Sequence, residues 1–233
     1  MVGQRPAWLP PGAPLRFPNP RFADPDGLVA IGGDLSPPRL RLAYDSGIFP
    51  WHDEGLPPMW WSPHPRAVLD PQHVHVSRSL RRHLNRHAFT LRYDTAFETV
   101  MRECGRQRED GTWILPEMIE AYCALFEAGD AHSVEVWVDG SLVGGLYGVQ
   151  RGGIFAAESM FHRQANASKV ALVAAVRSLF DAGIILFDVQ FITPHLASMG
   201  AYTIPRAEYL ERAERARNLP VCLHDLRLHV ETR

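Results

Sequence analysis

The sequence predicts an α+β fold in which a small N-terminal α+β domain, residues 1–70, precedes a larger domain, residues 71–233, with a mixed β-sheet. Proline marks the boundary, because 15 of the 19 prolines lie at or before Pro71. Four of the six tryptophans also lie before this point, so the first domain is aromatic and rich in turns. After it, the hydrophobic period alternates between that of helices and that of strands.

Composition narrows the class of protein. The chain has 233 residues, of which 46% are hydrophobic and 21% charged, as in ordinary globular proteins. Its formal net charge of -2 does not indicate a nucleic-acid partner, so any such surface must be local. The longest apolar run, Val170 to Val176, is too short to span a bilayer, and no signal peptide is recognisable. Three widely spaced cysteines fit a reducing compartment, so we expect a cytoplasmic protein.

Three helices are expected before the main sheet. Ser36 followed by two prolines predicts the start of a short helix that ends near Gly47. Asp94 can cap a second helix, whose apolar positions fall between Phe97 and Cys104. Pro116 can open a third helix that runs to Gly129.

The region after Gly129 predicts the sheet. Valines alternate with polar residues over 134–138, Asp139-Gly140 forms a turn, and residues 142–149 return, which indicates a β-hairpin. A strand at 154–161, an apolar helix through Phe180 and a buried strand at 184–191 then form a β-α-β unit. Such a unit makes its two strands parallel and adjacent or nearly so.

Polar residues interrupt both strands of this unit. Asp188 and Gln190 are two residues apart, so they share a sheet face near the end of an apolar strand, where ligands of parallel sheets bind. That end could equally be solvated. Glu158 lies among small and apolar residues of the other strand and needs a partner or an aqueous cleft. It could share a cleft with Asp188 and Gln190 that binds an amine, or pair with Arg163.

A basic stripe precedes the sheet. Between Asp70 and Asp94 there is no acidic residue. On a helix, Arg78, Arg82 and Arg86 would form one row with Arg81 beside it, a geometry suited to a phosphate backbone. A solvated helix face is the alternative, and the missing acidic residues favour an anionic partner.

Several chemistries are excluded by motif. The sequence has no G-x-S-x-G, Walker loop, dinucleotide fingerprint or H-E-x-x-H. Its cysteines and histidines show no zinc-binding spacing. We therefore predict no metal ion and no cofactor.

Nine short stretches occur in an order that closely resembles the bacterial leucyl/phenylalanyl-tRNA-protein transferases, from about Phe17 to Tyr209. They are GLVAIGGDL (27–35), GIFPW (47–51), WWSPHPR (60–66), GTW (111–113), HSVEVW (132–137), VGGLYG (143–148), ESMF (158–161), NASK (166–169) and DVQ (188–190). The resemblance implies an N-acetyltransferase-like second domain. It also implies an enzyme that moves leucine or phenylalanine from aminoacyl-tRNA to an N-terminal arginine or lysine, marking the acceptor protein for degradation.

The resemblance also implies roles for individual residues. Asp188 and Gln190 would assist attack of the acceptor amine, and Glu158 matches a polar site residue. Trp51 and Trp113 match aromatic residues near the terminal adenosine.

The side-chain specificity implies an apolar pocket. We take Leu146, Met160 and Leu172 as candidates for it, although all three could be ordinary core residues. Two positions depart from the family pattern: Asn85 lies where relatives can have lysine, and Ala175 lies where some place an aromatic residue near the adenosine.

Two other functions remain as alternatives. An acyl-CoA-dependent N-acetyltransferase would share the fold, but the junction FHRQANASK lacks the glycines of a pyrophosphate loop. A non-catalytic RNA-binding module would explain the basic stripe and the aromatic residues.

Overall fold

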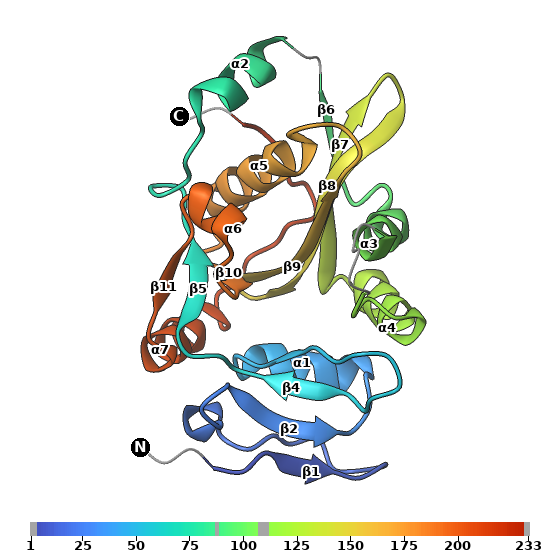
Figure 1. The fold of residues 1–233 in the computed structure, drawn as a ribbon, viewed down its shortest axis with the longest axis vertical. Coiled ribbons are helices and arrows are strands. Elements are labelled where there is room, and N and C mark those ends of the chain that lie inside the picture. Colours follow the sequence, from blue (N-terminus) through green and yellow to red (C-terminus); the bar gives the residue numbers. More distant parts are fainter. Residues whose placement is uncertain (1–3, 87–88, 107–111, 231–233) are drawn as a thin grey trace.

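The computed structural model describes residues 4–86, 89–106 and 112–230, without the side chains of residues 83, 85 and 86 (Figure 1). The N-terminal layer is a four-stranded sheet in the order β1-β2-β4-β3. Its elements are β1 (Ala7–Leu9), η1 (Pro20–Phe22), β2 (Leu28–Gly32), α1 (Pro37–Asp45), β3 (Phe49–Pro50) and β4 (Met59–Trp61). Helix α1 lies on the side of this layer that faces the rest of the protein (Figure 1).

The second part is a seven-stranded sheet in the order β11-β5-β10-β9-β8-β7-β6. Its strands are β5 (Arg66–Leu69), β6 (Thr90–Tyr93), β7 (Ala131–Val138), β8 (Ser141–Arg151), β9 (Ile154–His162), β10 (Leu186–Gln190) and β11 (Tyr202–Ile204). Within this sheet, strands β9 and β10 are parallel and the other described pairs are antiparallel. The predicted α+β fold with a mixed sheet is therefore confirmed.

The helices of the second part are α2 (Arg78–Arg86), α3 (Phe97–Arg106), α4 (Pro116–Glu127), α5 (Ala167–Asp181), α6 (Pro194–Ser198) and α7 (Arg206–Ala216). In the described part of the chain, no helix is long and apolar enough to cross a membrane. The chain passes from one sheet to the other between Trp61 and Arg66. A domain boundary at residue 70 stays a prediction.

The expected helices and the β-α-β unit are all present. Asp139 and Gly140 both have positive φ, as the tight β7-β8 turn requires, and Gly183 has a φ of 106° just after α5. The expected cap of α3 is wrong. Asp94 accepts from the backbone of Ser133, and the amide groups of Thr95 and Ala96 donate to the buried Glu135 carboxylate instead.

The large sheet has a core on each face. Leu146 and Tyr147 are neighbours on β8 and pack into different clusters, as alternation along a strand requires. Helix α5 supplies most of one core, and α3, α4 and α1 contribute to the other. Gly144 lets α5 approach β8, because a Cβ there would lie 2.5 Å from the Cβ of Ala167.

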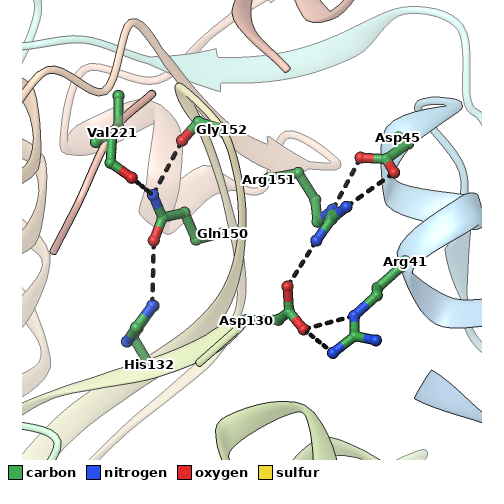
Figure 2. A network of polar contacts seen from close by, with 8 residues as sticks. All are labelled: Arg41, Asp45, Asp130, His132, Gln150, Arg151, Gly152 and Val221. Atoms are coloured by element: carbon green, nitrogen blue, oxygen red, sulfur yellow. Dashed lines mark hydrogen bonds and ion pairs between the residues drawn. The ribbon is translucent and has the colours of Figure 1, made fainter. Parts of the chain in front are cut away.

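Ion pairs fix the N-terminal layer against the large sheet. Arg151 of β8 bonds both carboxylate oxygens of Asp45, at the end of α1, and reaches Asp130 at 2.6 Å (Figure 2). Asp130 also accepts from Arg41 of α1 at 2.6 Å. Because α1 leads directly into β3, this network sets where β3 lies relative to the large sheet.

Candidate active site

A cavity of about 390 Å³ lies where the N-terminal layer meets the end of β10. It is lined by Phe49, Pro50, Trp51, Trp113, Glu158, Val189, Gln190, Phe191 and Thr193. Four of these residues, Trp51, Trp113, Glu158 and Gln190, were predicted site residues. The volume falls within the range of ordinary small-ligand sites.

Gln190 ends β10 in an unusual backbone conformation. Its φ is 56°, and the amide of Phe191 donates to the carbonyl of Val189 at 2.7 Å, which closes a tight turn around Gln190. The pairing of β10 with β5 shifts at the same place. A left-handed conformation at a non-glycine residue is uncommon and costs about 1 kcal/mol or more, so surrounding contacts must hold it.

Asp188 supplies one of these contacts and lies behind the cavity. Its Oδ1 accepts from the backbone amide of Gln190 at 3.0 Å. The fully buried carboxylate is also bonded twice by Arg66, at 2.8 and 2.6 Å, and by the Tyr209 hydroxyl at 2.8 Å. Asp188 does not line the cavity. Its side chain therefore does not share a cleft with Gln190 and Glu158, although the sequence had suggested that it would.

Glu158 of β9 faces Gln190. The Gln190 Nε2 donates to Glu158 Oε1 at 3.0 Å. Burial, helped by the charge of Asp188, raises the pKa of Glu158 to about 8, although hydrogen bonds from Tyr44 and Tyr122 and the charge of Arg66 favour the ionised form. Those two hydroxyls also contact each other at 2.5 Å. A carboxyl group that titrates close to neutral pH can handle an amine in either protonation state.

The alternative partner of Glu158 is engaged elsewhere. Arg163 donates to Glu103 of α3, with an Nη2–Oε1 distance of 2.7 Å.

Aromatic rings form part of the cavity wall. Phe191 packs edge-on against both Phe49 and Trp51, with ring centroids 5.7 and 5.3 Å apart. The Trp61 indole donates to the carbonyl of Trp51 and so fixes the backbone there. Trp51 is 39% exposed and Trp113 is nearly buried, so the cavity offers aromatic surface to a planar ligand.

The predicted side-chain pocket residues lie elsewhere. Leu146 and Leu172 are buried in the core around α5, and Met160 packs against that core while remaining partly exposed. None of the three is among the residues that line the described cavity. Ala175 is also fully buried there.

The predicted basic stripe forms a helix, α2, on which Arg78, Arg81 and Arg82 are exposed. The side chains of Arg86 and Asn85 lie outside the described residues. Arg177 of α5 lies close enough to Arg81 for their charges to interact, and burial together with Arg81 lowers the pKa of Arg177. The basic surface therefore includes a residue that the stripe alone did not predict.

Comparison with known families decides the assignment. Residues 68–214 match the family described as leucyl/phenylalanyl-tRNA protein transferase, and residues 33–64 match the N-terminal domain of the same family. The chain belongs to this family. It is therefore a transferase enzyme, as the resemblance of its motifs predicted.

Individual relatives of the transferase carry the same family name over nearly full length. The relative from Anaeromyxobacter sp. (strain Fw109-5) is 54% identical, covering 88% of this chain and 89% of its own. The relative from Thiobacillus denitrificans is 56% identical, covering 85% and 88%. Among solved structures, L-PGS from Bacillus licheniformis matches with a TM-score of 0.38 and 15% identity, covering 74% of this chain and 61% of that one.

Four residues that support the transferase site were missed in the sequence. Arg66 and Tyr209 hold Asp188, while Tyr44 and Tyr122 contact Glu158. Only Arg66 lay in a quoted motif, WWSPHPR. A buried arginine of this kind can be recognised only once the carboxylate that pairs with it is known. Among the described residues, no group of three or more His, Cys, Asp or Glu side chains is arranged to hold a metal ion.

Proposed function

We propose that this transferase moves leucine or phenylalanine from aminoacyl-tRNA to the N-terminal arginine or lysine of acceptor proteins, and that the reaction takes place at Gln190 and Glu158. The Gln190–Glu158 hydrogen bond carries the proposal. It engages the amide nitrogen of Gln190, so the amide oxygen is the atom that can accept a hydrogen bond from an attacking amine. The marking of acceptors for degradation in the cytoplasm belongs to the same proposal.

The transfer reaction needs little chemical activation by the side chains of the enzyme. An aminoacyl ester is already activated, and an α-amino group has a pKa near 8, so roughly a tenth of it is free base at neutral pH. The amine nitrogen forms a bond to the ester carbonyl carbon, the bond to the ribose oxygen breaks, and the amine's proton passes to that oxygen. Orientation of the two reactants by the cavity supplies much of the acceleration.

The acceptor is attracted by charge. Glu158 is partly ionised near pH 8 and supplies negative charge at the cavity wall, whereas the charge of Asp188 is neutralised by Arg66. A cationic N-terminus is favoured over a neutral one in such a field. Glu158 thus helps to position the acceptor's amino group before the amine gives up its proton.

The donor is held by rings and by the basic surface. Trp51 and Trp113 supply faces on which the terminal adenosine can stack. Arg78, Arg81 and Arg82 on α2 are exposed for contact with the tRNA backbone, and Arg86 is assigned with them. Of the predicted pocket residues, the partly exposed Met160 is retained as one against which the leucine or phenylalanine side chain packs, whereas Leu146 and Leu172 are buried in the core around α5 and do not line the cavity.

The structure does not favour the acyl-CoA alternative. A pyrophosphate needs free backbone amide groups at the junction between β9 and α5. Here the amides of Arg163 and Gln164 both donate to the carbonyl of Val143. The RNA-binding alternative explains α2 but leaves the Gln190–Glu158 pair without a role.

One experiment tests the proposal. Labelled leucyl-tRNA and phenylalanyl-tRNA are incubated with peptides that begin with Arg, Lys or Ala. We expect transfer to the first two only, and Gln190→Ala should reduce transfer far more than it weakens aminoacyl-tRNA binding. Gln150→Ala is the matched control, because Gln150 bonds His132 and Val221 away from the cavity (Figure 2). Equal losses of transfer and binding in Gln190→Ala, or intact tRNA binding with no transfer by the wild type, would reject the proposal.

A further inference from the structure

Arg66 is the most heavily engaged buried charge beside the cavity. It is 1% exposed, and its guanidinium bonds both oxygens of Asp188 in a two-pronged pair. The remaining nitrogen, Nη1, donates to the carbonyl of Gly47 at 3.2 Å. Burying a charged pair costs several kcal/mol unless its hydrogen bonds are satisfied, so this one persists because every branch of the guanidinium has a partner.

Arg66 determines how the Asp188 carboxylate is turned. Its Nε holds Oδ1 at 2.8 Å, and its Nη2 holds Oδ2 at 2.6 Å. With the carboxylate so oriented, Oδ1 is also placed 3.0 Å from the backbone nitrogen of Gln190. A carboxylate that accepts from the amide two residues on stabilises a turn, which is the local geometry that keeps Gln190 left-handed.

Arg66 also contacts a part of the cavity wall that comes from the N-terminal layer. Its guanidinium carbon lies 4.8 Å from the ring centroid of Phe49 and 4.3 Å from that of Tyr209. Phe49 lines the cavity, and Gly47 precedes it in the N-terminal layer. The same side chain therefore contacts the strand that carries Gln190 and the layer that carries the aromatic wall.

We propose that Arg66 is a positioning residue for the transfer reaction: through Asp188 it sets the left-handed backbone of Gln190, and through Phe49 it sets the distance between Gln190 and the aromatic wall. The inference rests on the proposed function, because it assumes that the reaction takes place at Gln190. Arg66 itself touches neither reactant. Asp188, in this account, acts only through the Gln190 backbone.

Lysine cannot replace Arg66 in this role. An ammonium group keeps the charge but lacks the planar fork that bonds two carboxylate oxygens and stacks between rings. We expect Arg66→Lys to lower kcat by about tenfold or more, because a displacement of about 1 Å at a reacting group can cost about a hundredfold. The KM for aminoacyl-tRNA should change by less than about threefold, because the described contacts of Arg66 are with Asp188, Gly47, Tyr209 and Phe49 and do not include α2 or a tryptophan.

Arg39→Lys is the matched control. Arg39 is also 1% exposed, pairs with Asp34 and donates to the carbonyls of Ala13 and Pro14, all within the N-terminal layer. It should lower the melting temperature and leave kcat unchanged. If both variants lowered kcat equally, Arg66 would have a general structural role and the inference would be wrong.

A double substitution separates this inference from the proposed function. If Arg66 acts through Gln190, adding Arg66→Lys to Gln190→Ala should reduce kcat little further, so the two effects would not multiply. Fully multiplicative effects would overturn the inference while leaving the role of Gln190 intact. Full activity in Gln190→Ala alone would instead remove the proposed function.

A milder variant covers the case in which Arg66→Lys does not fold. Tyr209→Phe removes one hydrogen bond to Asp188 and preserves the ring that stacks on Arg66. We expect it to lower kcat by about threefold to tenfold with an unchanged KM, which is less than the full cost of a hydrogen bond to a charged group because Arg66 still holds Asp188. Wild-type kcat in Tyr209→Phe, or a loss confined to KM, would contradict the inference.

Discussion

Replacement of Glu158 by glutamine should stabilise the enzyme in a way that depends on pH. Burial and the charge of Asp188 raise the pKa of Glu158 from 4.5 to about 8 in the folded protein. Between these two values the unfolded chain releases this proton and the folded one retains it, so the free energy of unfolding falls as pH rises. Above pH 8 both forms are ionised and the loss is complete. A glutamine at position 158 does not titrate, so the free energy of unfolding of the variant does not fall with pH for this reason.

The size of this change in the free energy of unfolding follows from the difference between the two pKa values of Glu158. At about 1.4 kcal/mol per pH unit, the shift from 4.5 to about 8 sets a ceiling of about 5 kcal/mol. Solvent in the cavity screens this half-buried carboxyl, and the lost tyrosine contacts offset part of the gain, so we expect about 2 kcal/mol. For a chain of this size that corresponds to roughly 4 to 8 °C in Tm.

The assay compares thermal unfolding of Glu158→Gln and the wild type from pH 5 to pH 9. The difference in Tm should grow in favour of the variant up to about pH 8 and then level off. Glu103→Gln is the control with the opposite sign, because hydrogen bonding and the charge of Arg163 lower the pKa of Glu103. That variant should be less stable than the wild type by a constant amount over the same range. A Glu158→Gln difference that did not change with pH would refute the argument.

Three further predictions follow from other parts of the structure. Trp51→Ala should raise the KM for aminoacyl-tRNA by about fivefold to a hundredfold in steady-state kinetics, because one stacking surface for the adenosine is lost; an unchanged KM would remove Trp51 from the donor site. Arg82→Gln should reduce the log-log salt dependence of tRNA binding by roughly 0.7 to 0.9, from a wild-type slope of about 3 for four phosphate contacts; an unaltered slope would show that α2 does not contact the tRNA. Arg151→Met should lower the free energy of unfolding by about 2 kcal/mol in urea titrations, because Asp45 and Asp130 lose their bridging partner; a change below about 0.5 kcal/mol would show that the network is only a surface feature.

Much of the fold followed from local signals. The change from alternating valines to an apolar helix predicted β7 through β10 in order, and the parallel β9–β10 pair followed from the connection between them. The cap of α3 did not follow. The capping acceptor is Glu135, about forty residues further along the chain, and no local rule connects a strand carboxylate to a distant helix start.

The site was partly predictable for the same reason. Glu158 and Gln190 meet because parallel strands in the register Asp188 to Ala156 bring their ends together. The side chains of Asp188 and Gln190 were expected on one face, but the turn at Gln190 breaks the alternation that the argument assumed. Arg66 could not be found, because its partner Asp188 is on a strand that only the sheet order places beside it.

The cavity wall contains residues from both sheets, with consequences for how the enzyme is made. Phe49 and Trp51 are synthesised early, whereas Gln190 and the Asp188 that supports it come near the end of the chain. A partly synthesised chain thus has an aromatic surface but no enclosed binding space. The cavity therefore forms only once β10, which carries Gln190, has joined the large sheet.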